Sequence, residues 1–421
     1  MTGNGGDIVR QALSGIRVLE VCDELGQYAG KLLADLGADV IKIEQPAGEG
    51  SRLVPPFVDD IPDPNRSLSF WYYNTNKRSI ILNLADQNAD QHAFLDLVRT
   101  ADIVIEGGRP GRLASLGLGF ERMKAARSNL IMCSMTPFGQ DGPWSGNLSS
   151  DMVALALGGQ MNMCGYDPSD APDAPPIYPQ ADHGFNTAGH FAAMGMLVAL
   201  LHRDQTGEGQ YIDCSMHEAL AGTTELGMPY WLYGGQNILR QTGRHASVAR
   251  TERWVYRARD GRDVLVFGVG RDSSTWPKVK RWLQGHGFGF QLDEARFDDP
   301  QRRQPGRGSP EAREIMETVA AFIAATDAET VYREAQAIDQ AWGVVRTPDE
   351  TVDDPHWWDR SFFVDAPVPG DESRFAAMPG APYLLSATPW TLTRPAPNLG
   401  EHTDELLAEI ASNIRELTVG S

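Results

Sequence analysis

The chain has few cysteines for its length, and they are too widely spaced to form a sequence motif. Cys22, Cys133, Cys164 and Cys214 are spread over 421 residues without a CxxC motif. Each lies in or beside an apolar run, which favours buried free thiols over disulfide bonds or a thiolate metal site. We therefore expect a cytoplasmic protein, because structural disulfides are typical of oxidising compartments.

Positive charge is also scarce. The sequence has 37 lysines and arginines against 56 aspartates and glutamates, so its formal net charge is −19. Such a chain repels polyanions, and we expect neither nucleic acid nor an anionic membrane as a partner. A small anionic ligand would need a local basic site.

Long hydrophobic segments and targeting signals are missing as well. The longest apolar run, residues 191–201, is too short to cross a bilayer and is flanked by His190 and His202. Residues 1–7 contain neither the basic nor the apolar segment of a signal peptide. We expect no membrane association.

Sequence motifs for metals and dinucleotides are absent. There is no HExxH, no close pair of cysteines or histidines and no acidic triplet, so we expect no metal. The first turn, residues 22–30, lacks GxGxxG, and Asp23 and Glu24 would repel a pyrophosphate. We expect no nicotinamide or flavin cofactor, although Glu44 stands where a ribose-binding acid would be.

Strand and helix patterns alternate through the first half of the chain. Residues 16–21 and 40–44 read as apolar strands, and residues 29–36 repeat apolar side chains at helical spacing between them. The pattern continues with strands expected at 80–84, 101–106, 129–134 and 211–216 and helices around 94–98 and 188–202. Such a βαβ series predicts an α/β fold with a parallel sheet covered by helices.

The character of the chain changes after about residue 225. Residues 254–267 predict a hairpin that turns at Asp260-Gly261, and Ser309-Pro310 begins a helix with one apolar face. The polar residues 298–308 read as a surface loop. We divide the chain into a large domain (1–225), a smaller α+β domain (226–378), and a proline-rich segment with a terminal helix (379–421).

One aspartate stands out as a candidate for chemistry. Asp182 lies in Gln180-Ala181-Asp182-His183-Gly184, just ahead of the helix expected around 188–202. The helix dipole and the free N–H groups of the first turn favour a carboxylate at this place. Two interpretations stay open: a helix cap, which aspartate forms well, or an anionic nucleophile.

Basic residues gather in two other places. Lys77 and Arg78 precede the strand at 80–84, and Arg109 and Arg112 follow a strand at the edge where open α/β sheets bind ligands. They predict a local site for phosphates and a carboxylate, with solvated surface charge as the alternative. The aromatic residues Trp71, Tyr72, Tyr73, Trp231 and Tyr233 suggest an acyl pocket or, alternatively, core packing.

Taken together, these segments resemble the family III CoA-transferases over nearly the whole chain. The likeness rests on Leu13-Ser-Gly-Ile-Arg-Val-Leu-Glu20, Leu33-Ala-Asp-Leu-Gly-Ala-Asp-Val-Ile-Lys-Ile-Glu44, Asn76-Lys-Arg-Ser79, Ala101-Asp102, Arg109-Pro-Gly111, Phe138-Gly-Gln-Asp-Gly-Pro143, Thr206-Gly-Glu-Gly-Gln210 and Leu399-Gly-Glu-His-Thr-Asp-Glu405. The resemblance implies a Rossmann-like large domain, a small domain, and two chains interlinked like rings in a homodimer. The segment 379–421 would then return to the large domain.

The resemblance also implies a reaction and a set of site residues. Asp182 would attack the thioester of an acyl-CoA, pass through an aspartyl anhydride and an aspartyl-CoA thioester, and hand the CoA to an acceptor acid. Gly158 and Gly159 would stabilise oxyanions, and Asp151 would position the acyl group or a water. Coenzyme A, the acyl carrier, would contact Leu25, Gly26, Gln45, Leu82, Lys77, Arg78, Gly107, Gly108, Arg109 and Arg112.

The sequence departs from the family pattern at three places. The family aspartate precedes the glycine matching Gly189 by four residues, where this chain has Phe185, so Asp182 stands three residues early. Glu106-Gly107-Gly108 replaces the usual Glu-Asn-Phe, and Ser150-Asp151 replaces the His-Asp pair of related racemases. Two alternatives therefore remain: a racemase or another acyl-CoA enzyme on the same fold, and a non-catalytic CoA-binding subunit of a heteromeric transferase.

Overall fold

The protein divides into two compact units that do not follow the chain in one cut. The computed structural model describes residues 11–85, 89–179, 181–270, 272–303 and 309–419. Unit 1 comprises Met1–Gly158, Gln180–Thr223 and Asp354–Ser421, and unit 2 comprises Gly159–Pro179 and Thr224–Asp353. The chain therefore leaves unit 1 twice and returns to it twice.

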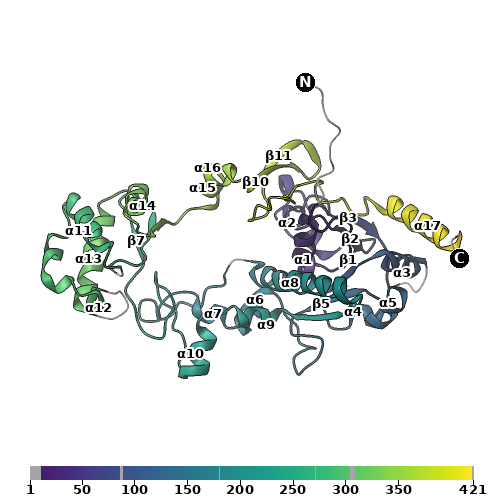
Figure 1. The fold of residues 1–421 in the computed structure, drawn as a ribbon, viewed down its shortest axis with the longest axis horizontal. Coiled ribbons are helices and arrows are strands. Elements are labelled where there is room, and N and C mark those ends of the chain that lie inside the picture. Colours follow the sequence, from purple (N-terminus) through teal and green to yellow (C-terminus); the bar gives the residue numbers. More distant parts are fainter. Residues whose placement is uncertain (1–10, 86–88, 180, 271, 304–308, 420–421) are drawn as a thin grey trace. The chain divides into compact units, whose positions relative to one another are not determined.

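Unit 1 is built on a six-stranded parallel sheet (Figure 1). The strands are β1 (Arg17–Val21), β2 (Asp39–Glu44), β3 (Arg78–Ile81), β4 (Ile103–Gly107), β5 (Ile131–Thr136) and β6 (Tyr211–Ser215), in the order β3-β2-β1-β4-β5-β6. Most of β1 to β5 is buried, as the apolar strand patterns predicted. This strand order reverses direction between β1 and β4, so the predicted α/β fold is confirmed and has a topological switch point there.

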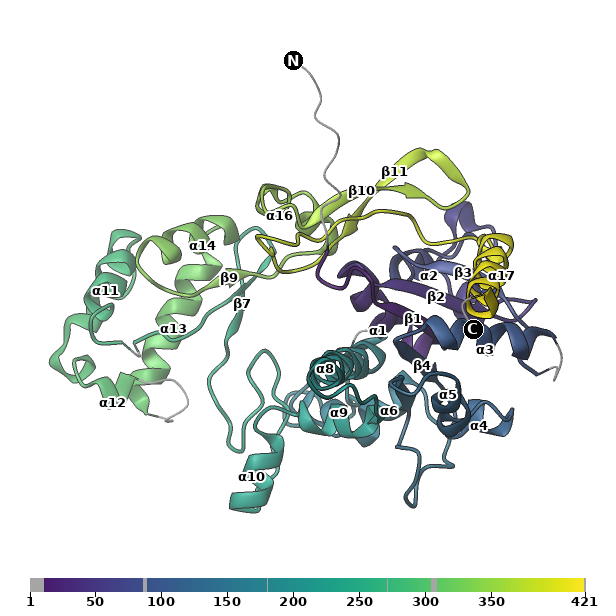
Figure 2. The same cartoon turned by 45° about the vertical axis from the view of Figure 1, so that its right-hand side comes forward.

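Helices cover both faces of this sheet. On one face, α3 (Ala89–Thr100), α4 (Arg112–Ser115), α5 (Phe120–Ala126) and α17 (Thr403–Val419) share a core with the strands through residues such as Leu19, Ile41, Phe94, Leu97, Val104, Met123 and Leu406. On the other face, α1 (Glu24–Asp35) packs along α8 (His183–Thr206) (Figure 2). The predicted terminal helix therefore belongs to the large unit.

Helix α8 has two different faces. Ala188, Gly189, Ala192 and Met196 are buried, and Gly189 lies against Tyr28 of α1. The opposite side exposes large apolar side chains: Phe191, Met194, Val198 and Leu201. Among the described helices, α8 alone has the length and apolar composition that would suffice to cross a membrane, and 44% of its most apolar window is buried within the protein. Its small buried residues suit the close packing of a core helix.

A C-terminal hairpin completes unit 1. β10 (Phe363–Val368) pairs antiparallel with β11 (Asp371–Pro379), and the helices α2 (Leu68–Tyr73) and α16 (Pro355–Asp359) lie beside it. The indole Nε1 of Trp71 donates a hydrogen bond to the Pro367 carbonyl at 2.9 Å. The expected boundary at residue 378 is therefore wrong, because this hairpin packs on α2 and not within the smaller unit. Helices α6 (Asp151–Leu157) and α9 (Met216–Gly222) and the 3-10 turns Gly50–Leu53 and Val58–Asp60 also belong to unit 1.

Unit 2 has its own core. Its strands β7 (Val255–Arg257), β8 (Asp263–Leu265) and β9 (Gly343–Val344) form an antiparallel sheet, and the predicted turn at Asp260-Gly261 joins the first two. The helices are α7 (Gln160–Met163), α10 (Gly227–Gly234), α11 (Trp276–Gly285), α12 (Pro300–Arg303), α13 (Pro310–Ala324), α14 (Ala328–Ala337) and α15 (Pro348–Val352), with 3-10 turns at Phe290–Asp293 and Ala295–Phe297. Ser309 caps α13 as predicted, since its hydroxyl accepts the Ala312 N–H. The expected loop 298–308 contains α12 instead, and residues 304–308 lie outside the described part.

The segment Gly159–Pro179 joins unit 2 through ion pairs. Asp170 lies 3.0 Å from the guanidinium group of Arg250 and 3.5 Å from that of Arg244. The Asp167 N–H also donates to the hydroxyl of Thr242 at 2.9 Å. This segment was expected in the large domain, and its partners 74 or more residues downstream place it in unit 2.

Candidate functional site

Asp182 occupies the N-cap position of α8 without capping it. Its backbone is left-handed (φ 63°, ψ 5°), and its side chain makes no hydrogen bond to the N–H groups of the first turn. Only its backbone carbonyl enters the helix, by accepting the Asn186 N–H at 2.8 Å. A non-glycine residue in this conformation is strained, and such strain is found at functional sites. The carboxylate is therefore free of the structural role that aspartate usually has here.

Asp151 takes over the capping. Its Oδ1 accepts the backbone N–H of Phe185, in the first turn of α8, at 2.9 Å. Asp151 is buried at the start of α6, and Gly184 is required at the contact because a Cβ there would lie 2.9 Å from this oxygen. Asp151 therefore positions the first turn of α8.

Tyr73 holds the Asp182 carboxylate. The phenol oxygen donates to Oδ2 of Asp182 at 3.3 Å and accepts from the Asn186 side-chain amide at 3.1 Å. Tyr73 is buried at the end of α2, where Tyr28 packs against it edge to face with ring centroids 5.8 Å apart. Oδ1 of Asn186 is buried without a hydrogen-bond partner among the described residues. These contacts form a chain of hydrogen bonds from Asn186 through Tyr73 to Asp182.

The surroundings make Asp182 more basic than an ordinary aspartate. Burial raises the pKa of Asp182, the negative charge of Asp151 raises it further, and the Tyr73 hydrogen bond lowers it. Burial also raises the pKa of Glu24, with the nearby charges of Asp23, Asp182 and Asp151 adding to the effect. The pKa of Tyr73 is raised above its usual range, chiefly by burial, so its phenol stays a hydrogen-bond donor at neutral pH.

The residues around α6 that were predicted for the site have structural positions. The Gly158 N–H donates to the Ala154 carbonyl at 2.7 Å and so ends α6, which leaves it unable to stabilise an oxyanion. Gly159 begins unit 2. Ser150, at the place of the racemase histidine, caps α6 by accepting the Val153 N–H at 3.3 Å. No second base for racemisation therefore stands at this position.

The switch point of the sheet gathers several of the residues predicted to contact CoA. Leu25 and Gly26 form a non-helical first turn of α1, which follows β1, and Gly107 is the last residue of β4, with Gly108 directly after it. These segments touch so closely that a Cβ on Gly107 would lie 1.8 Å from the Leu25 carbonyl oxygen. Arg109 is exposed beside them. Glycine at 107 thus serves this close approach, which the Glu-Asn-Phe pattern of the family would not allow in this geometry.

A cavity of about 200 Å³ lies next to the switch point. Its wall includes Gln45, Leu82 and Arg112, three residues predicted from separate segments, together with Val21 and Glu49. Arg112 also donates to the Gly107 carbonyl at 3.1 Å. The structure therefore brings these three residues together at the carboxyl ends of β1 and β2, where ligands bind in open α/β sheets.

Lys77 and Arg78 do not join them. The Lys77 ammonium is fully buried and uses its three donors on Glu20 (2.7 Å), the Gln27 carbonyl (2.8 Å) and Asn74 (2.9 Å). Arg78 is buried too and binds Asp39, Glu405 and Glu409, which ties α17 to the sheet. The predicted phosphate site is wrong for these two residues, because carboxylates of the chain itself already pair with both: the buried Glu20 with Lys77, and three partly exposed carboxylates with Arg78.

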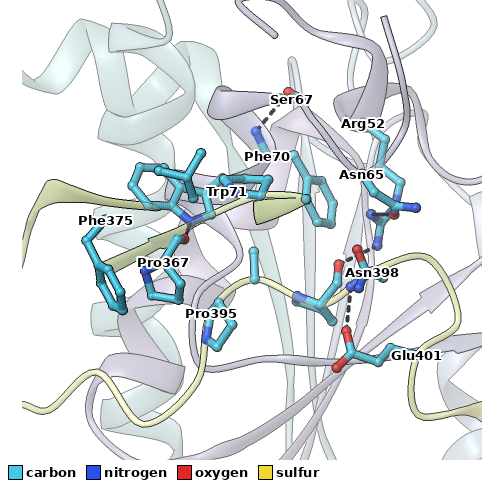
Figure 3. A pocket seen from close by; sticks show the side chains of 15 residues that line it. Arg52, Asn65, Ser67, Phe70, Trp71, Pro367, Phe375, Pro395, Asn398 and Glu401 are labelled. Carbon is cyan, nitrogen blue, oxygen red and sulfur yellow. Dashed lines mark hydrogen bonds between the residues drawn. The ribbon is translucent and has the colours of Figure 1, made fainter. Parts of the chain in front are cut away.

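A larger cavity, of about 340 Å³, lies between α2 and the C-terminal hairpin (Figure 3). Trp71 and Pro367 form one side of it. Arg52 on the other side is locked by a bidentate pair with Glu44, with Nε–Oε2 2.6 Å and Nη2–Oε1 2.7 Å. The wall includes neither Asp182 nor Tyr73, so its size alone does not connect it with the candidate nucleophile.

Tyr73 and Asp151 are the functional residues whose roles the sequence did not reveal. Tyr73 directly precedes the Asn74–Ser79 motif, but nothing local shows that it reaches a residue 109 positions later. The resemblance gives Asp151 a role in positioning the acyl group or a water, but nothing local shows that it caps a helix that begins 32 residues later. Within the described residues, no group of three or more His, Cys, Asp or Glu side chains is arranged to hold a metal ion.

Comparison with known proteins shows the family of this chain. The family model "CoA-transferase family III" matches residues 13–403. The chain is 31% identical to the succinyl-CoA:(R)-benzylsuccinate CoA-transferase subunit BbsE of Thauera aromatica, over 95% of this chain and 94% of that protein. It is 31% identical to the succinate–glutarate CoA-transferase of Agrobacterium fabrum, over 96% and 97%. A CAIB/BAIF family protein from Brucella suis shares the fold with a TM-score of 0.78 and 26% identity, over 95% of this chain and 99% of that one. The chain belongs to CoA-transferase family III.

Proposed function

We propose that this enzyme moves CoA between an acyl-CoA and a carboxylic acid, with Asp182 as the nucleophile. The observation that carries the proposal is that Asp182 stands at the start of α8 with its carboxylate released from capping and held by Tyr73. The three-residue displacement from the family position is compensated by the left-handed turn and by Asp151, which caps the helix in its place.

The reaction proceeds through two covalent states of Asp182. A carboxylate oxygen attacks the thioester carbonyl, the C–S bond breaks, and CoA leaves as a thiolate from a mixed anhydride. The thiolate then attacks the Asp182 carbonyl, which releases the donor acid and leaves an aspartyl-CoA thioester. An acceptor carboxylate takes the same path in reverse and departs as the new acyl-CoA, so the aspartate is regenerated.

The neighbours of Asp182 serve this chemistry by orientation. Tyr73 binds Oδ2, which leaves Oδ1 for attack on the thioester. The raised pKa of Asp182 makes the ionised carboxylate a stronger nucleophile. The N-terminus of α8 stabilises negative charge that develops on the oxygens.

The CoA moiety is proposed to bind at the switch point. Gly107, Gly108 and Arg109 offer backbone and a cationic side chain at the carboxyl ends of the strands, and Gln45, Leu82 and Arg112 line the adjoining cavity. Several relatives are named for dicarboxylic substrates, among them succinyl-CoA:mesaconate and succinate–glutarate CoA-transferases. We therefore propose a dicarboxylic acyl donor such as succinyl-CoA.

The enzyme is further proposed to work as a cytoplasmic, interlinked homodimer. The exposed apolar side chains of α8 (Phe191, Met194, Val198 and Leu201) recur at intervals of three and four residues, as in helices that pack on a partner. The four cysteines are free thiols, which suits a reducing compartment.

A trapping experiment tests the nucleophile. The protein is incubated with succinyl-CoA, treated with borohydride or hydroxylamine, and digested for mass spectrometry. We expect a modified peptide whose mass change maps to Asp182, and none in Asp182→Ala. Exchange of labelled succinate that survives in Asp182→Ala would refute the assignment.

One relative supports a second candidate. The benzylsuccinate transferase protein is named as a subunit, so this chain as a non-catalytic CoA-binding subunit is the alternative. In that case the purified chain alone binds CoA but forms no adduct and catalyses no exchange. Adduct formation by the chain alone would show that the chain is itself catalytic.

A further inference from the structure

Unit 2 contains a cavity of about 500 Å³ whose wall is rich in arginine. It is lined by Arg244, Arg250, Arg253 and Arg313, by Glu252 and Glu317, and by Thr251, Tyr256, Met316 and Ala320. The wall itself has four arginines and two glutamates, and Asp167 and Asp170 pair with three of these arginines from outside it. Neither Asp182 nor any residue of the switch point belongs to this wall.

Arg244 is the buried anchor of the cavity. Its side chain is 8% exposed, and its Nη1 lies 3.5 Å from Asp170 and 3.9 Å from Asp167. Its Nε is buried and has no hydrogen-bond partner among the described residues. A buried guanidinium N–H without an acceptor is unfavourable, and a bound oxygen would satisfy it.

Arg313 faces the same cavity from α13. Its guanidinium group has no ion pair within the described part of the chain, although Glu317 lies one turn further along the helix. Arg250 and Arg253 are more exposed and lie 3.0 and 4.0 Å from Asp170. Asp167 and Asp170 are not part of the cavity wall. They contact the guanidinium groups of Arg244, Arg250 and Arg253 and so orient them from outside the cavity.

We propose that this cavity binds a small molecule with two or more anionic oxygen groups, either carboxylates or phosphates. Guanidinium groups present paired N–H donors that match both kinds of oxygen. Glu252 and Glu317 limit the affinity and favour a ligand that reaches Arg244 and Arg313 without approaching them closely. The site does not depend on Asp182 as nucleophile, and it is tested by binding alone.

Calorimetric titration of the full-length protein with succinate and, separately, with inorganic pyrophosphate tests this site. We expect saturable binding of at least one probe that weakens with added salt and weakens roughly tenfold in Arg244→Gln and in Arg313→Gln. Arg281→Gln, an exposed arginine of the same unit outside the cavity, is the matched control and keeps the wild-type affinity.

The two probes separate the two sources of anionic oxygen. Succinate binding that needs both arginines assigns a dicarboxylate, and pyrophosphate binding that needs them assigns a phosphate group. Arg244→Gln loses contacts to Asp167 and Asp170, so its thermal unfolding is checked, whereas Arg313→Gln breaks no ion pair with any residue that the structure describes. Absence of binding by both probes, or equal affinity in Arg313→Gln and Arg281→Gln, would overturn the proposal.

Discussion

The backbone N–H of Phe185 donates to the carboxylate of Asp151, 34 residues earlier in the chain, at 2.9 Å. This bond does for helix α8 what an N-cap aspartate ordinarily does for its own helix. Asp182 holds the N-cap position but leaves its carboxylate to Tyr73. Asp151 thus stabilises the N-terminus of α8, and Asp182 keeps its carboxylate available for the proposed reaction. This difference leads to opposite expectations for their substitution.

Replacing Asp182 by asparagine removes the nucleophile but no structural contact of the helix N-terminus. We expect CoA-transfer activity to fall by about a thousandfold or more, because an amide cannot form the anhydride. Since burial and Asp151 disfavour the charged carboxylate, the melting temperature of Asp182→Asn is expected to be no lower than that of the wild type. Steady-state exchange assays measure the loss of activity, and calorimetric melting measures the melting temperature. An active Asp182→Asn protein would contradict this assignment.

Replacing Asp151 by alanine removes the cap of α8. We expect a loss of about 1 kcal/mol in the free energy of unfolding, the usual cost of a missing N-cap. Asp151→Asn keeps an oxygen that can accept the Phe185 N–H and serves as the matched control, with a smaller loss. Urea denaturation measures both. Equal stability of Asp151→Ala and the wild type would show that the cap contributes nothing.

Tyr73→Phe tests the hydrogen bond to the nucleophile. Because this bond lowers the pKa of Asp182, its loss should raise that pKa, so the acid limb of the kcat/KM profile moves to higher pH. We expect kcat to fall by up to about tenfold, the worth of one hydrogen bond. Tyr72→Phe, at the neighbouring position, is the control. If the acid limb of Tyr73→Phe coincides with that of the wild type, Tyr73 does not act on Asp182.

Much of this fold follows from the sequence, and the reasons differ between elements. The strands are apolar runs buried on both faces, so β1, β2, β4 and β5 are visible locally, within two residues of their ends. The limits of unit 2 are not visible, because the hairpin at Phe363–Pro379 is assigned by its packing on Trp71, almost 300 residues earlier. Local pattern contains no information about such partners.

The site shows the same limit. Asp182 was found because a motif and a helix start coincide there, whereas Tyr73 and Asp151 act through contacts across 109 and 34 positions. Lys77 was misjudged for the same reason: its partner Glu20 lies 57 residues away on a strand that reads as apolar. The sequence offered one signal, which is that Glu20 is a charged residue within an apolar strand. Such a buried carboxylate indicates that a cation from elsewhere in the chain pairs with it.

The contrast between Lys77 and Arg109 tests this correction. Lys77→Met should lower the free energy of unfolding by about 3 kcal/mol, since it breaks a buried ion pair, and leave the KM for acyl-CoA unchanged. Arg109→Ala, which removes an exposed charge beside the switch point, should do the opposite and raise that KM by roughly threefold to tenfold. Arg360→Ala, an exposed arginine elsewhere in unit 1, is the control. A raised KM in a folded Lys77→Met protein would restore Lys77 to the CoA site.

The exposed face of α8 makes the homodimer testable by a charge. Val198 and Leu201 are 64% and 62% exposed within a single chain, so a glutamate at either position costs a lone chain little. In a dimer that buries this face, each chain would bring an unpaired carboxylate into an apolar contact, and association should weaken by at least about a hundredfold. Leu53→Glu is the matched control, because Leu53 is 61% exposed in the same unit but lies outside α8. Interlinked chains separate only when they unfold, so each protein is first unfolded in urea and refolded. Light scattering coupled to size exclusion should then give a dimer for the wild type and Leu53→Glu, and a smaller mass for Val198→Glu and Leu201→Glu. Identical masses for all four proteins would show that this face of α8 does not mediate association.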